Sequence, residues 1–249
     1  MSRSSDHCLF RVLAGIVLPV YGLVARLRWA GEEHLPAEGG FVVVPNHVTE
    51  LDPLTVGITL YRNGVLPRFL AKESLFRTPV LGTLLRAVGQ VPVLRGSADA
   101  AAALTSARAV LDAGGAVVVY PEGTLTRDPE LWPMTGHTGA VRLALATGVP
   151  VIPVAHWGDH AVLGRDPSTG RRTVSLFPRK QVRVRIGPPV DLTPWRGDVP
   201  ELNRPEGRDR ARLHDATEAV MQAVAHELAV LRGTDAPARR WDHRRGGRL

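Results

Sequence analysis

Three short apolar runs, each followed at once by a polar turn, constrain the fold of this 249-residue chain more than any other feature. They are residues 41–45 (FVVVP), 116–120 (AVVVY) and 151–155 (VIPVA). A β-branched run of this length, bounded by turn residues, is typical of a strand buried on both faces. Because helical patterns separate the runs, the sequence predicts an α/β fold: a single domain with a mixed, largely buried sheet flanked by helices.

The expected helices lie between and after these runs. They cover residues 52–61, 75–87, 97–112, 138–147 and 206–231. The first begins at Asp52-Pro53, where Asp is a favoured N-cap and Pro suits the first helical position. Residues 182–186 alternate valine or isoleucine with arginine, which predicts a half-exposed edge strand.

Residues 1–30 form the most apolar segment, with no charged residue from Val12 to Ala25. Those residues would span about 21 Å as a helix, less than the roughly 30 Å hydrocarbon core of a bilayer, and Pro19 interrupts them. We interpret 1–30 as an apolar helical segment that lies in, or dips into, a membrane interface. A buried core helix is the alternative. A signal peptide is disfavoured because no small-residue cleavage site follows.

The net charge of +7 is concentrated at the C-terminal end, where residues 232–249 carry six arginines against two aspartates. The sequence predicts a folded domain over 31–232 and a basic, disordered tail over 233–249. This tail either attracts anionic lipid or is merely solvated. Because the body of the chain has little excess charge, no nucleic-acid partner is expected. A single cysteine, Cys8, excludes an internal disulfide framework and a cysteine metal cluster.

Polar residues follow the first strand as the motif NHVTELD, residues 46–52. Sites in α/β sheets lie at the carboxyl ends of the strands. A histidine five residues before an aspartate can meet the carboxylate, which would fix its tautomer and leave the other nitrogen free to accept a proton. Taken alone, this pattern is explained better by Asp52 as a helix cap and His47 as an ordinary loop residue.

The second strand runs directly into Pro-Glu-Gly-Thr, which places Glu122, Gly123 and Thr124 at another strand end. Glycine there allows a ligand to approach the backbone closely, although an ordinary turn has the same composition. Between the two motifs, Lys72 and Arg95 supply cations, and an arginine can bind a phosphate through two hydrogen bonds. A solvated surface arginine is the plainer reading of Arg95 alone.

Taken together, these motifs resemble the glycerolipid acyltransferase family, the lysophosphatidate acyltransferases of phosphatidic acid synthesis. That family has four ordered blocks: NHxxxxD, GxxxxxR, FPEGT and VP[IV]xPV. Here they read as residues 46–52, 89–95, 120–124 and 149–154. The resemblance covers about residues 30–190. Two positions depart from the family pattern: Leu125 stands where an arginine is usual, and His137 where a lysine is often found.

The resemblance implies that His47 deprotonates the free hydroxyl of 1-acylglycerol 3-phosphate, which then attacks an acyl thioester, while Asp52 holds the imidazole. It implies that Arg95 binds the acceptor phosphate. Lys72, Glu122, Gly123 and Thr124 are the further acceptor-binding candidates. The co-substrate is acyl-CoA or acyl-ACP, with no further cofactor and no metal. The expected location is the cytoplasmic face of the cell membrane, as a peripheral or interfacially anchored enzyme.

Three alternatives remain. The enzyme can act on another lysophospholipid or a glycolipid, which Leu125 favours. It can be a non-catalytic lipid-binding protein, which needs the same apolar face and cations. It can be a metal hydrolase that combines His47 and Asp52 with His156 or His160, although the HExxH helix of such enzymes is missing from the sequence.

Overall fold

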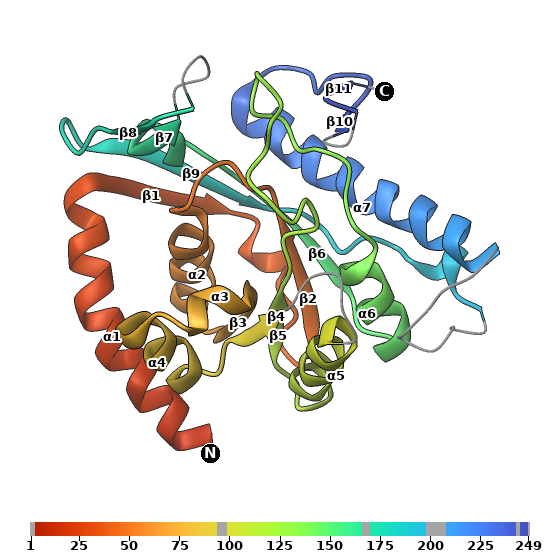
Figure 1. Cartoon of the computed structure of the whole chain (residues 1–249), viewed down its shortest axis with the longest axis horizontal. Helices are drawn as coiled ribbons and strands as arrows, with labels where there is room; N and C mark the ends of the chain where they lie inside the picture. Colours follow the sequence, from red (N-terminus) through yellow and green to blue (C-terminus); the bar gives the residue numbers. More distant parts are fainter. Residues whose placement is uncertain (1–2, 94–98, 166–169, 198–207, 243–244, 249) are drawn as a thin grey trace.

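A seven-stranded sheet in the order β1-β9-β6-β2-β5-β3-β4 forms the centre of the molecule (Figure 1). A computed structural model describes residues 3–93, 99–165, 170–197, 208–242 and 245–248 of the chain. The strands are β1 (Ala25–Ala30), β2 (Phe41–Pro45), β3 (Pro67–Lys72), β4 (Val91–Val93), β5 (Ala116–Val118), β6 (Val151–Trp157) and β9 (Lys180–Ile186). β6 and β9 run antiparallel and all other neighbours run parallel, so the predicted mixed sheet is confirmed.

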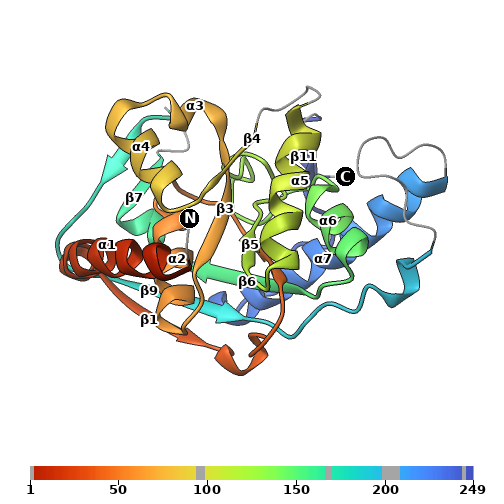
Figure 2. The same ribbon diagram turned by 90° about the horizontal axis from the view of Figure 1, so that it is seen from below.

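Helices cover both faces of this sheet (Figures 1 and 2). The helices are α1 (Arg3–Val24), α2 (Asp52–Arg62), α3 (Glu73–Phe76), α4 (Pro79–Ala87), α5 (Asp99–Asp112), α6 (Gly139–Thr147) and α7 (Arg208–Arg232). Apolar residues of α5, α6 and α7 pack on one face, and those of α2, with α1 beside it, pack on the other. Since burying a valine or leucine contributes roughly 1.5–3 kcal/mol, these two interfaces supply most of the stability.

The sheet edges differ from the prediction. The strand expected at an edge over 182–186 is β9, and it has neighbours on both sides, β6 and β1. The alternation in β9 has another cause. Val182, Val184 and Ile186 are buried in the core, whereas the two arginines between them are partly or fully exposed. The edge strand on this side of the sheet is β1, which occupies the last six residues of the segment expected to be helical over 1–30. The N-terminal helix ends at Val24, so the domain begins earlier than residue 31.

Several helices also begin or end at residues other than those predicted. The helix expected over 75–87 is divided into α3 and α4, because Thr78 is extended before Pro79, as a residue preceding proline prefers. The long C-terminal helix, expected over 206–231, is described from Arg208 to Arg232. Residue 97, the expected start of another helix, lies outside the described residues, and α5 is described from Asp99.

The C-terminal tail is ordered where the structure describes it, and the predicted disorder over 233–249 is wrong there. Strands β10 (Trp241–Asp242) and β11 (Gly247–Arg248) form a short antiparallel hairpin. Arg248 donates to both carboxylate oxygens of Asp128 at 2.9 and 3.1 Å, and Asp128 is buried. The amide of Thr135 donates to the carbonyl of Trp241 at 3.0 Å. These contacts, made more than a hundred residues away along the chain, outweigh the polar composition of the tail.

Candidate active site

Three parallel, adjacent strands deliver polar residues to one edge of the sheet. β6, β2 and β5 are neighbours in the sheet, so their carboxyl ends lie together. His47 follows β2, Glu122 follows β5, and His156 lies near the end of β6. This is the edge at which open α/β sheets place their binding sites.

His47 and Asp52 meet as the sequence predicts. Nδ1 of His47 lies 2.9 Å from Oδ2 of Asp52, and the Asp52 side chain is fully buried whereas that of His47 is 18% exposed. A carboxylate on Nδ1 fixes the tautomer in which Nδ1 carries the proton, so Nε2 has a free lone pair. The buried Asp52 carboxylate thus orients the accessible His47 imidazole, as in a general-base pair.

Asp52 does not cap the helix that it begins. The N-cap position of α2 is Leu51, which makes no side-chain capping bond. The Asp52 carboxylate instead turns back toward the preceding loop, where Oδ2 accepts from the amides of Val48 at 2.6 Å and Thr49 at 2.9 Å. These bonds, together with the bond from His47, close the loop into one fixed conformation.

Glu122 fixes the backbone of the same loop from the next strand. Its carboxylate accepts from the amide of His47 at 2.9 Å and from the amide of Met134 at 3.0 Å. Burial raises the pKa of Glu122 to about 8, against the two amides, which lower it. Gly123, with φ at 69°, turns the chain away immediately afterwards. Glu122 is therefore a support of His47 in this structure, with its carboxylate facing the protein interior.

Tyr120 holds the imidazole from the side. Its ring is stacked on that of His47, with centroids 4.2 Å apart and planes at 29°. Phe69 of β3 stacks in turn on Tyr120 at 6.4 Å. The Tyr120 hydroxyl is buried without a hydrogen-bond partner among the described residues, and burial, followed by the charge of Asp52, raises the pKa of Tyr120. Only the face of this ring has a visible role.

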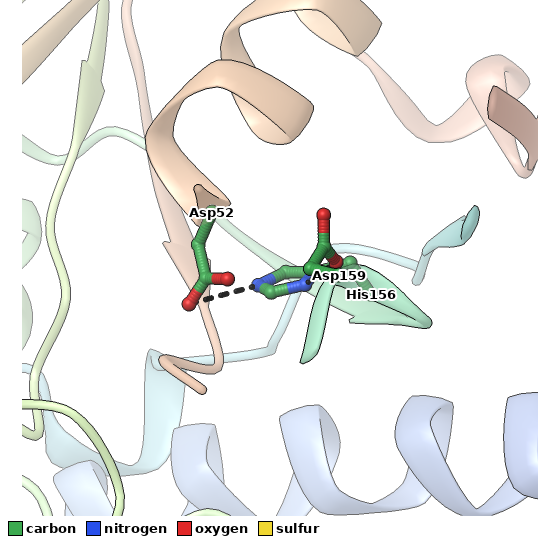
Figure 3. Close-up of side chains that lie close together, drawn as sticks. All are labelled: Asp52, His156 and Asp159. Atoms are coloured by element: carbon green, nitrogen blue, oxygen red, sulfur yellow. Dashed lines mark hydrogen bonds and ion pairs between the residues drawn. The ribbon is translucent and has the colours of Figure 1, made fainter. Parts of the chain in front are cut away.

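A second, fully buried histidine lies behind the pair. Nδ1 of His156 is 2.7 Å from Oδ2 of Asp159, and Nε2 is 2.8 Å from the carbonyl oxygen of Asn46. Both partners can only accept, so both nitrogens carry protons and the ring is a cation. Nε2 also lies 3.7 Å from Oδ2 of Asp52 (Figure 3). Burial lowers the pKa of His156, but Asp52 and Asp159 raise it further, to about 9.

The contacts around His156 reach from β2 to α1. The Asn46 side chain donates to the carbonyl of His156 at 3.1 Å and accepts from its amide at 2.9 Å. Asp159 accepts from the hydroxyl of Thr55, which is 2.7 Å from the hydroxyl of Tyr21. The sequence prediction placed His156 only in the metal-hydrolase alternative. The signal that could have found its role is its position directly after an apolar run, as with His47.

Asp52, His156 and Asp159 are close enough together to hold a cation. Both nitrogens of His156 already donate to protein acceptors, and its ring is itself positively charged. A bound metal ion would have to displace the proton of one of these nitrogens and break the hydrogen bond that it makes. These residues therefore do not suit the metal-hydrolase alternative, and neither His47 nor His160 belongs to the cluster.

The other predicted site residues are less closely grouped. Lys72 ends β3 on the same edge of the sheet, two strands from β2, and is exposed. Gly123 and Thr124 lie in the turn after β5 and are partly exposed. Arg95 lies outside the described residues, so the structure gives it no position. An amide that the prediction missed joins this turn to the first motif: Thr126 donates to the carbonyl of His47 at 2.7 Å.

An apolar cavity of about 150 Å³ adjoins this site, between α1, α2 and β3. Its walls include Phe10 and Val17 of α1, Leu54 and Ile58 of α2, and Phe69 of β3. Phe69 is also the residue stacked on Tyr120. Apolar side chains thus continue from the imidazole to the inner face of the N-terminal helix.

Comparison with known proteins decides the family. A sequence model described as Acyltransferase matches residues 26–157, just over half of the chain. The chain belongs to this acyltransferase family. The matched range contains His47, Asp52, Glu122 and His156.

Individual relatives are similar over most of this acyltransferase. A 1-acyl-sn-glycerol-3-phosphate acyltransferase from Bacillus subtilis is 27% identical over 219 residues, which cover 87% of this chain and 95% of the relative. A chloroplastic enzyme of the same name from Brassica napus is 32% identical over 76% of this chain and 51% of its own length. The crystal structure of the lysophosphatidate acyltransferase PlsC from Thermotoga maritima shares the fold, with a TM-score of 0.64 and 24% identity. That match covers 97% of this chain and 86% of the other.

Proposed function

We propose that this acyltransferase transfers an acyl chain from an acyl thioester to the free hydroxyl of 1-acylglycerol 3-phosphate, giving phosphatidic acid. The observation that carries the proposal is the accessible His47 imidazole, oriented by the buried Asp52 at 2.9 Å. The names of the relatives from Bacillus subtilis and Brassica napus support this choice of acceptor.

In this mechanism Nε2 of His47 takes the proton of the acceptor hydroxyl as its oxygen attacks the thioester carbonyl. Asp52 stabilises the imidazolium that forms, and general-base assistance of this kind contributes about 10²–10⁴ in rate. The proton then passes from His47 to the departing thiolate. Transfer is direct, since the chain has a single cysteine, at position 8 in the N-terminal helix, and no GxSxG sequence.

The test is substitution of His47 by alanine, assayed with acyl-CoA and a panel of lysolipid acceptors. We expect turnover to fall at least a hundredfold while the melting temperature stays within a few degrees, because the imidazole is needed only for proton transfer. His226→Ala, at an exposed position on α7, is the matched control. An unchanged rate in His47→Ala would overturn the role of His47 as the base. A wild type that acylates no acceptor of the panel would favour a lipid-binding protein and end the proposal.

The acceptor phosphate is assigned to Arg95, with Gly123 and Thr124 as further acceptor-binding candidates, following the family resemblance. Arg95→Ala should raise the KM for the acceptor far more than the KM for the donor. Equal effects on both would refute this assignment. The same panel addresses the second candidate, another lysophospholipid or a glycolipid acceptor, which the uncommon Leu125 and His137 favour.

We further propose that the enzyme works on the cytoplasmic face of the membrane, docked through α1. Among the described helices, none is both long and apolar enough to cross a bilayer. One side of α1 nevertheless presents Val12, Ile16, Val20 and Leu23, each more than half exposed. Their spacing of three to four residues puts them on one stripe, as in helices that lie in a membrane interface.

Because residues 25–30 form β1, removing the whole N-terminal segment would also remove a strand. The sharper variant changes Ile16 and Val20 to serine and leaves the inner face of α1 intact. We expect it to sediment less with phospholipid vesicles than the wild type. A control with Val230→Ser, also exposed but on α7, should sediment normally. Equal sedimentation of all three proteins would contradict the docking proposal.

A further inference from the structure

The folded tail encloses a large polar cavity on the opposite side of the molecule from α1. Its volume is about 760 Å³, within the range typical of small-molecule sites. It lies between residues 135–138 just before α6, the first half of α7, and Ala238, Arg239, Arg240, Asp242 and Arg245 of the tail. Figures 1 and 2 both show α1 at one end of the molecule, and α6, α7 and the β10–β11 hairpin toward the other.

Cations dominate the lining of this cavity. Arg210 comes from α7, and Arg239, Arg240 and Arg245 come from the tail. Arg240 pairs with Glu218 and donates to Gln222 at 2.9 Å. The other three arginines make no ion pair with a carboxylate among the described residues, so their charge is available to a ligand.

The start of α6 adds partial positive charge. This helix has nine residues, and its N-cap residue, Thr138, makes no side-chain capping bond. Thr138 itself lines the cavity. The free amides of a first helical turn favour an anion, and the N-cap end of α6 borders the cavity through Thr138.

One segment of chain separates this cavity from the candidate active site. The amide of His137, in the cavity wall, donates to the carbonyl of Pro121 at 2.9 Å. Pro121 lies between Tyr120, stacked on His47, and Glu122, bonded to the His47 amide. The cavity wall and the residues that support His47 therefore share this segment of chain.

We propose that this cavity binds the phosphorylated nucleotide of a coenzyme A thioester, the acyl donor. The inference rests on the proposed function. The acceptor is a lipid, expected at the apolar side of the molecule, whereas a water-soluble donor approaches from the side that faces away. A recessed hollow suits a small polyanion better than the convex acidic surface of a carrier protein. The bidentate geometry of arginine suits phosphate.

The test combines binding and kinetics in the full-length protein with Arg239 and Arg245 both changed to alanine. Calorimetry with coenzyme A itself measures binding without turnover. We expect the double variant to bind coenzyme A at least tenfold more weakly, and its KM for acyl-CoA to rise by a similar factor. The KM for the lysolipid acceptor and the kcat should stay within twofold. Arg108→Ala with Arg183→Ala, remote from the cavity lining, removes the same charge and is the matched control.

The outcomes separate the possibilities. A raised acceptor KM with unchanged coenzyme A binding would assign the cavity to a lipid phosphate and overturn the proposal. A raised KM for acyl-ACP alone would also overturn it, in favour of a carrier-protein surface. Unchanged binding and kinetics would overturn it as well. A further outcome is that the wild type binds coenzyme A without acylating any lysolipid, while the double variant binds coenzyme A weakly. In that case the cavity assignment stands and the proposed function fails.

Discussion

The buried cation behind Asp52 gives a prediction that distinguishes a role in tuning the base from a purely structural role. His156→Gln removes the charge and keeps a side chain of similar reach. Nδ1 of His47 and Nε2 of His156 lie 2.9 and 3.7 Å from the same Asp52 oxygen, so they are at most about 6.6 Å apart. At an effective dielectric constant of about 20, two unit charges at that distance interact by about 2.5 kcal/mol.

Loss of the His156 cation makes the surroundings of the Asp52 carboxylate more negative by one unit, so the site holds protons to higher pH. The acid limb of the kcat/KM profile should therefore move upward by between one and two pH units. The shift is smaller than the full interaction energy gives, because the His47 side chain is 18% exposed to solvent, which screens the charges. The assay is kcat/KM against pH from 5 to 9, and circular dichroism monitors the fold.

The matched control for this experiment is His160→Gln, four residues along the chain. His160 is tilted against Trp157 at 4.2 Å, and burial lowers its pKa, so this substitution removes an imidazole without removing a charge. Its pH profile should coincide with that of the wild type. If His156→Gln lowers the melting temperature but leaves the acid limb in place, His156 is only a packing element and the electrostatic reasoning is refuted.

Three further outcomes follow from the buried groups of the site. Tyr120→Phe removes an unsatisfied hydroxyl and keeps the stack on His47, so it should raise stability by about 1 kcal/mol in urea titration without lowering kcat; a large loss of kcat would reveal a role for the hydroxyl. Glu122→Gln points an amide group at a backbone N–H, so unfolding experiments at pH 9, above the pKa of Glu122 of about 8, should show a loss of about 1–3 kcal/mol; full stability there would show that the carboxylate is not needed as a double acceptor. Stability should also fall from pH 7 to pH 10. The pKa of His156 is raised to about 9, so its contribution to the free energy of unfolding is complete below about pH 6.5 and is lost as pH rises through 9. The pKa of Glu122 is raised to about 8, and its contribution also falls as pH rises. A melting temperature that rises over this range would contradict both assignments.

The parts of the fold that could be predicted from the sequence are those specified by neighbouring residues. β2 and β6 are apolar runs with polar residues directly behind them, so both the strands and the approach of His47 to Asp52 follow from local pattern. The turn at Glu122 is local in the same sense. Its carboxylate, however, faces the backbone of His47, which no pattern in the sequence indicates.

The parts that could not be predicted depend on partners far along the chain. β1 continues an apolar segment without a break, and its only sign is the alternation of Arg26 and Arg28 with apolar residues. His156 is charged because Asn46 and Asp52 approach it from about a hundred residues away. The tail is ordered because Asp128 is buried within reach of Arg248.

The pairing of β1 with β9 has a consequence for biosynthesis. β9 is the one partner of β1 in the sheet, and it follows about 150 residues later in the chain. At translation rates of about 5–20 residues per second, the first strand waits roughly 10–30 s for that partner to leave the ribosome. During this interval α1, the helix ahead of it, lacks its packing against Val182 of β9. If α1 docks on a membrane as proposed, the nascent chain can reach the lipid surface before its catalytic domain has closed, and the enzyme would complete its folding there.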